Sequence, residues 1–114
     1  LEVNMRPSGG YSPDMYNFAN EVNVYKIWAD MVAFDRATTD LDRPHHFCAF
    51  CGRRDGKNFK MDHDAIMAKY GANMKMSGRI PDALSGAMAN QMYVANYDTE
   101  EEMMSAFQRM CKTW

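Results

Sequence analysis

A ten-residue segment with almost no apolar side chains divides this sequence into two parts with different patterns. Residues 35–44 contain three aspartates and two threonines and little that could enter a core. Before this segment, apolar residues recur mainly at helical spacing, and after it short alternating runs are typical of strands. We therefore predict an α+β chain with two domains, covering residues 1–43 and 44–114.

The first domain is predicted to contain one strand and two helices. Residues 1–6 alternate apolar and polar side chains, as a strand with one buried face does. Ser12 and Pro13 predict the start of a helix over about 12–20, with the Ser12 hydroxyl as N-cap and proline at the first helical position. A second helix over about 24–34 is indicated by apolar residues at steps of three and four, namely Val24, Ile27, Trp28, Met31 and Val32.

The second domain is predicted to be a small antiparallel layer with the element order β-β-α-β-β-α. Asp55-Gly56 predicts a tight hairpin between strands 45–54 and 57–61. Asp62 is expected to cap a short helix that ends near Gly71. Strands are then expected at 73–80 and 91–97, with a connection of small residues between them.

The last helix has the clearest signals in the sequence. Thr99 and Glu102 have the spacing of a capping box, and further acidic residues suit the positive end of a helix. An apolar stripe follows at helical spacing, formed by Met103, Phe107, Met110 and Trp114. We predict that this stripe covers the sheet.

Composition excludes several classes of function. The net charge is −2, so there is no excess of basic residues to neutralise nucleic-acid phosphates. The apolar runs are too short to span a bilayer. Three cysteines, an odd number, argue against a disulfide framework and for a reducing compartment, so we expect a cytoplasmic protein with no nucleic-acid or membrane partner.

The polar face of the first strand carries the most informative chemistry. Glu2, Asn4 and Arg6 alternate along residues 1–6, which places a carboxylate, an amide and a guanidinium on one face. Carboxylate and amide oxygens are the kind of ligand that Mg²⁺ selects, and a guanidinium suits a phosphate oxygen. Three polar residues in alternation are also found on ordinary solvated strands. The context here is more specific, because a Pro-Ser-Gly-Gly turn and a helix start follow at once.

In this context the sequence resembles the end of an ATP-grasp domain, of the carbamoyl-phosphate-synthase-like and biotin-carboxylase-like branch. The matching residues are Leu-Glu-Val-Asn-Met-Arg-Pro-Ser-Gly-Gly at positions 1–10, Asp14-Met15-x-Asn17 and Val24-Tyr25-x-Ile27-Trp28-Ala29. They lie within residues 1–34. Over residues 45–114 the resemblance is looser and lies in the order and type of elements. It implies that residues 1–43 end an ATP-grasp domain and that a small C-terminal domain follows.

The resemblance also implies a reaction and its cofactors. ATP would phosphorylate a small-molecule carboxylate, and a nitrogen nucleophile would attack the acyl phosphate. Glu2 and Asn4 would be the metal ligands and, with Arg6, the nucleotide-binding residues, with Mg²⁺ (or Mn²⁺) bridging the ATP phosphates. Arg6 would be catalytic, stabilising the transferring phosphoryl group. Phosphoryl transfer depends mainly on positioning and charge neutralisation, which such residues supply.

Other parts of an ATP-grasp site are not recognisable in the sequence. No glycine-rich lid or phosphate-cradling lysine loop can be located. We therefore expect a C-terminal fragment, inactive alone, whose partner is the N-terminal part of the same chain. The apolar faces of residues 1–34 would then be exposed and could support a homodimer.

Two other interpretations stay open. The chain could be a non-catalytic domain that packs against or regulates an ATP-binding neighbour. Less favoured is a small zinc module, suggested by His45, His46, Cys48 and Cys51, because the odd separation of the cysteines puts them on opposite faces of a strand. The basic cluster at 53–57 could contact a phosphate or another domain of the parent protein, but we favour a solvated turn at this position.

Overall fold

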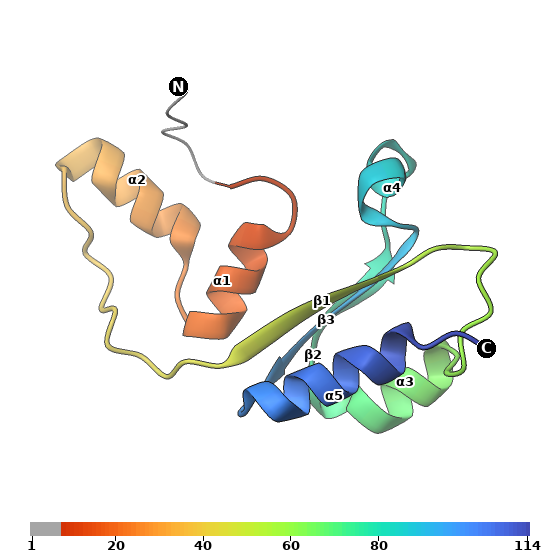
Figure 1. The fold of residues 1–114 in the computed structure, drawn as a ribbon. Helices are drawn as coiled ribbons and strands as arrows, with labels where there is room; N and C mark the ends of the chain where they lie inside the picture. The colour runs from red at the N-terminus through yellow and green to blue at the C-terminus, as the bar shows by residue number, and fades with distance from the viewer. Residues whose placement is uncertain (1–7) are drawn as a thin grey trace, which may run out of the picture. The chain divides into compact units, whose positions relative to one another are not determined.

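The computed structural model describes residues 8–114 of the chain, which divides into two compact units, Leu1–His45 and His46–Trp114. The described residues form an α+β protein with five α-helices and one three-stranded antiparallel sheet, so the predicted fold class is confirmed (Figure 1). The predicted strand 1–6, with Glu2, Asn4 and Arg6, lies outside the described residues.

The first unit contains helices α1 (Ser12–Asn20) and α2 (Val24–Phe34), which have the predicted bounds. Residue Asn17 makes the corner between them: its side-chain oxygen accepts from the Val24 N–H at 2.7 Å, and its carbonyl accepts from the Val22 N–H at 3.3 Å. The corner also needs a left-handed residue, which is Glu21 at φ 50°. Polar bonds therefore set the angle between these helices.

The predicted cap of α1 is wrong. Tyr11, not Ser12, is the N-cap residue, and no side chain caps this helix. Pro13 lies in the first turn, where it needs no N–H partner, and is buried. By contrast α2 has a side-chain cap that was not predicted, because the Asn23 oxygen accepts from the N–H groups of Tyr25 and Lys26.

A buried carboxylate on α2 fixes the start of the loop that separates the two units. Asp30 is 8% exposed and accepts from Lys26 Nζ at 2.6 Å and from the Thr38 hydroxyl at 2.5 Å. These bonds lower the pKa of Asp30, first through Lys26 and then through Thr38. The polar segment 35–44 is therefore attached to the helix rather than free of it.

In the second unit, β3 (Gln91–Tyr97) lies between β1 (Phe47–Arg53) and β2 (Met74–Arg79), and both neighbours run antiparallel to it. The outer strands therefore run parallel to each other, and α3 (His63–Tyr70), followed by a short 3₁₀ turn, makes the crossover between them. Seven residues of α4 (Asp82–Met88) join β2 to β3. The chain ends with α5 (Glu100–Cys111).

Helices α3 and α5 cover the same face of the sheet (Figure 1). The core between them and the strands consists of Cys51, Ile66, Tyr70, Tyr93, Ala95, Tyr97, Ala106 and Met110. The predicted caps of both helices are present, because Asp62 accepts from the Ala65 N–H and Thr99 from the Glu102 N–H. Of the apolar stripe predicted for the last helix, Met110 is buried in this core and Met103 and Phe107 pack against it. The prediction is wrong for Trp114, which lies beyond the end of α5 and is exposed.

The predicted order β-β-α-β-β-α is wrong in its second strand. Gly56 does turn the chain, with φ 80°, but residues 57–61 do not pair with β1. They instead run beside the chain's end, where Lys60 N–H donates to the Lys112 carbonyl and Trp114 N–H to the Asn58 carbonyl. Strand β3 lies beside β1 in the centre of the sheet, where its side chains are almost all buried. Burial of this mostly apolar segment favours that pairing.

The predicted connection of small residues at 81–90 is also different, since most of it is α4. Pro81 precedes this helix and Asp82 lies in its first turn, both of which favour a helix start. Arg54, the residue after β1, holds the end of α4 by donating to the carbonyls of Ser85 and Gly86. These tertiary bonds stabilise a helix too short to persist alone.

Candidate functional site

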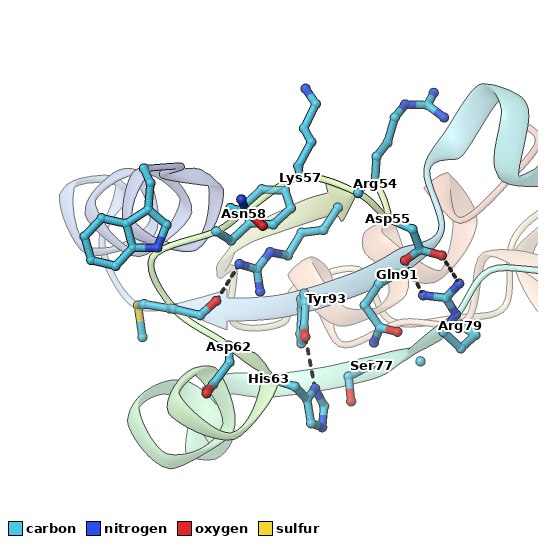
Figure 2. A pocket seen from close by; sticks show the side chains of 16 residues that line it. Arg54, Asp55, Lys57, Asn58, Asp62, His63, Ser77, Arg79, Gln91 and Tyr93 are labelled. Atoms are coloured by element: carbon cyan, nitrogen blue, oxygen red, sulfur yellow. Dashed lines mark hydrogen bonds and ion pairs between the residues drawn. The ribbon is translucent and has the colours of Figure 1, made fainter.

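A candidate site lies near the ends of helices α3 and α5, over the sheet of the second unit. Helix α3 begins at His63 and α5 ends at Cys111, and two rungs of the sheet lie near these helix ends. These rungs are Arg53, Gln91 and Arg79, then Cys51, Tyr93 and Ser77. All but Cys51 line an open pocket of about 1010 Å³, together with the loop at 54–59, the start of α3 and Trp114 (Figure 2).

A buried arginine forms the wall of this pocket. Arg53 is only 7% exposed, and its guanidinium carbon lies 3.8 Å from the centre of the Phe59 ring. Its Nη2 donates to the Met61 carbonyl at 2.5 Å, which holds the 57–61 segment against β1. Its Nε is buried without an acceptor, and no carboxylate pairs with Arg53 among residues 8–114. Buried cations usually have an anionic partner, so this charge favours an anion in the pocket.

The rim of the pocket carries an ion pair that occupies a second arginine. Arg79 binds Asp55 through both of its terminal nitrogens, at 2.8 and 2.5 Å (Figure 2). The pair lowers the pKa of Asp55 and raises that of Arg79, in both cases mainly through the hydrogen bonds. Both side chains are about 60% exposed, so solvent screens the pair and it adds little stability.

The opposite wall offers polar hydrogen-bonding groups. His63 Nδ1 lies 3.0 Å from the Tyr93 hydroxyl, which fixes the imidazole beside Ser77 (Figure 2). Gln91 adds an amide between Arg79 and Tyr93. The pocket is lined by four cationic side chains and only two carboxylates, although the whole chain has a net charge of −2. The cations are Arg53, Arg54, Lys57 and Arg79. This arrangement can bind a small anion, and no nucleophile paired with a base is evident among the residues that line it.

Sequence reasoning singled out part of this pocket but favoured a different interpretation of it. The cluster 53–57 was expected to be a solvated turn at a hairpin tip, whereas it lines the pocket and follows the end of β1, whose partner is β3. Ser77, Gln91 and Trp114 were missed because they are distant in the sequence from the cluster. Only the register of the strands brings them together.

The zinc interpretation is not favoured by the geometry of β1. Cys51 is fully buried in the helix-covered core, whereas Cys48 lies at an odd separation along the same strand and therefore on the other face. His45 contacts the Asn20 side chain at 2.8 Å, and His46 lies 3.6 Å from Asp98. Residues 8–114 contain no group of three or more histidine, cysteine or acidic side chains placed to hold a metal ion.

Glu2, Asn4 and Arg6 lie outside the described residues, so their predicted roles as metal ligands, nucleotide-binding residues and catalytic residue stay predictions. Over the described part of the chain, no helix combines the length and the apolar character needed to cross a membrane. Comparisons with protein-family models, with curated proteins and with solved structures find no match to this chain.

Proposed function

We propose that this chain is the C-terminal portion of a cytoplasmic, ATP- and Mg²⁺-dependent ATP-grasp ligase. The ligase would activate a small carboxylate as an acyl phosphate for attack by a nitrogen nucleophile, and the portion alone would be inactive. One observation carries the proposal: Glu2-x-Asn4-x-Arg6 is followed at once by a turn and two helices whose corner uses residues of the same resemblance, Asn17 and Val24. The residues that follow the motif therefore have a defined structure.

The surface of α2 supports the same proposal. Its large apolar side chains are strongly exposed, at 41% for Trp28, 45% for Met31, 71% for Val32 and 64% for Phe34. Contiguous exposed apolar surface of this kind marks a face that packs against another surface. We assign that surface to the preceding part of the same ATP-grasp domain, since helices that follow the metal-binding strand would pack on its sheet.

On this proposal the three polar side chains of the first strand divide the work. Glu2 and Asn4 would hold Mg²⁺ (or Mn²⁺) against the terminal ATP phosphates, and the ion would neutralise their charge. Arg6 would donate to the transferring phosphoryl group, where its charge-assisted hydrogen bonds strengthen as negative charge spreads. Carboxylate and amide oxygens fit this ion, which prefers hard oxygen ligands.

Nucleotide binding and turnover test the proposal directly. Calorimetric titration of the 114 residues with Mg-ATP should show no binding at micromolar affinity, because the lid and phosphate-binding lysines are expected elsewhere. In the longer protein, Glu2→Ala should reduce ATP turnover at least about 100-fold, since a metal ligand and its charge are lost. Asn4→Ala should act in the same direction.

The control is Glu101→Ala, which removes an exposed acid from the first turn of α5 in the second unit. This variant should keep its turnover. The proposal is overturned if Glu2→Ala leaves turnover unchanged in a folded protein, or if the 114 residues alone bind Mg-ATP tightly.

A second candidate is a non-catalytic domain that packs on or regulates an ATP-binding neighbour. The specific observation that favours it is the pocket of the second unit, where Arg53 is buried and has no carboxylate partner within residues 8–114, and could hold a small anionic regulator. The same experiment separates the two functions, because this candidate predicts that turnover survives Glu2→Ala.

A further inference from the structure

Two cysteines far apart in the sequence lie against each other in the second unit. Cys51 on β1 and Cys111 at the end of α5 are 60 residues apart, yet their sulfur atoms are 3.0 Å apart. Both are free thiols. This separation exceeds the length of a disulfide bond by only about 1 Å. The pair is thus close to bonding distance without any rearrangement of the backbone elements.

The surroundings hold both thiols in place. Cys51 is fully buried and lies opposite Tyr93 in the strand register, in the centre of the core. Cys111 packs against the same core directly after the buried Met110. Beyond it the chain is fixed by the bond from Lys60 N–H to the Lys112 carbonyl at 2.9 Å. Because neither element is free to move away, the two sulfur atoms stay together in the folded protein.

We propose that Cys51 and Cys111 are a redox modification site, at which a small-molecule disulfide oxidises the pair to a reversible β1–α5 disulfide. The Cys111 thiolate attacks one sulfur of the reagent, which forms a mixed disulfide and releases the first small thiol. The Cys51 sulfur then attacks Cys111, which forms the protein disulfide and releases the second small thiol. Two electrons pass from the protein to the reagent, and the two thiol protons end on the released thiols.

The positions of the two thiols fix this order of attack. Cys111 is partly exposed and lines a small cavity of about 260 Å³, whereas Cys51 has no exposed surface. Burial also raises the pKa of Cys51, with a further contribution from the hydrogen bond with Cys111, so Cys51 is a poor first nucleophile. Its own step is intramolecular and needs no access for the reagent. Arg54 and Lys57 line the same cavity, which favours a reagent that carries carboxylates.

The third cysteine provides a matched comparison within the chain. Cys48 lies on the same strand as Cys51 but on the opposite face, and burial raises its pKa to about 11. It should therefore stay reduced while the pair is oxidised. An odd number of cysteines is compatible with a disulfide here because Cys48 is the one left over.

Thiol counting after oxidation tests the proposal. The folded chain is incubated with oxidised glutathione, then denatured and alkylated, and its intact mass is measured. In the wild type one thiol should remain, and in Cys48→Ala none, with a mass about 2 Da lower before alkylation. Reduction with dithiothreitol should restore the thiols. The oxidised Cys48→Ala protein should also unfold at a higher urea concentration than its reduced form, because the link closes a long loop.

The single variants separate this pair from any other link. Cys51→Ala should stop at the mixed disulfide on Cys111, so it gains one glutathione and no internal link. Cys111→Ala should gain neither. Circular dichroism checks that each single variant is folded. The wild-type thiol count tests the proposal even if a variant does not fold. The proposal fails if the wild type keeps all three thiols, if the link formed joins Cys48 to Cys51, or if Cys48→Ala accumulates only glutathione adducts.

Discussion

At the scale of single residues, two glycines on the two outer strands of the sheet show how closely the second unit is packed. Gly52 on β1 and Gly78 on β2 are both cross-strand partners of Met92. A Cβ at Gly52 would lie 2.9 Å from the Met88 carbonyl oxygen and 3.2 Å from the Ala89 side chain, whereas a Cβ at Gly78 would meet nothing within 4 Å. Only at Gly52 does the end of α4 approach the sheet so closely.

We predict that Gly52→Ala lowers the free energy of unfolding by about 1–3 kcal/mol, because a backbone oxygen cannot move aside as a flexible side chain would. Gly78→Ala, its matched control, should change that free energy by less than about 0.5 kcal/mol. Urea unfolding of both variants measures the difference. Equal effects of the two substitutions would contradict the proposed close approach.

At the scale of elements, the caps of the two N-terminal helices show where local sequence signals succeed and fail. Ser12-Pro13 is a good helix start by composition, yet Ser12 is already inside α1 and caps nothing. Asn23 accepts from two N–H groups of α2, at 3.1 and 3.2 Å. The difference arises because backbone conformation at the helix start, and not residue type alone, decides whether a side chain can reach the free N–H groups.

Asn23→Ala should therefore cost about 1 kcal/mol of the stability of the first unit, since it leaves two N–H groups of α2 without a protein acceptor. Ser12→Ala should have an effect within about 0.5 kcal/mol. Trp28 lies in α2, so its fluorescence during urea unfolding reports on this unit when Trp114 is replaced by phenylalanine. A larger loss for Ser12→Ala than for Asn23→Ala would show that the cap is assigned to the wrong residue.

At the scale of the whole molecule, the two units hold themselves together in different ways. The second unit has a continuous apolar core between its sheet and two helices. In the first unit, polar contacts fix the corner at Asn17 and the loop after α2, where the buried Asp30 binds Lys26 and Thr38. The first unit should therefore be the more sensitive to acid, because its loop depends on one ionised carboxylate.

The sign of this pH effect follows from the pKa of Asp30. That pKa is lowered from 3.8 in the folded chain, so the contribution of Asp30 is complete above about pH 4 and is lost as the pH falls through the folded value. In the Trp114→Phe protein, the stability of the first unit, measured by Trp28 fluorescence during urea unfolding, should fall below about pH 4. Adding Asp30→Asn should lower stability at neutral pH and flatten this dependence. An unchanged acid slope would mean that other carboxylates cause it.

The sequence by itself determined the elements whose signals are local. The helix 24–34, the strand 91–97 and the cap at Thr99 follow from periodicity and capping chemistry within a few residues, and each is present. The residues Glu2, Asn4 and Arg6 also come from the sequence alone, and their roles stay predictions.

Only the tertiary structure decided which strands pair and which side chains meet. Asp55-Gly56 makes its turn, but the burial of β3 is worth more than the contacts of the 57–61 segment, so β3 lies beside β1. That pairing, with the packing of α5, creates both the pocket around Arg53 and the contact between Cys51 and Cys111. Local pattern cannot reveal such sites, because they depend on competition between distant segments for the same buried surface.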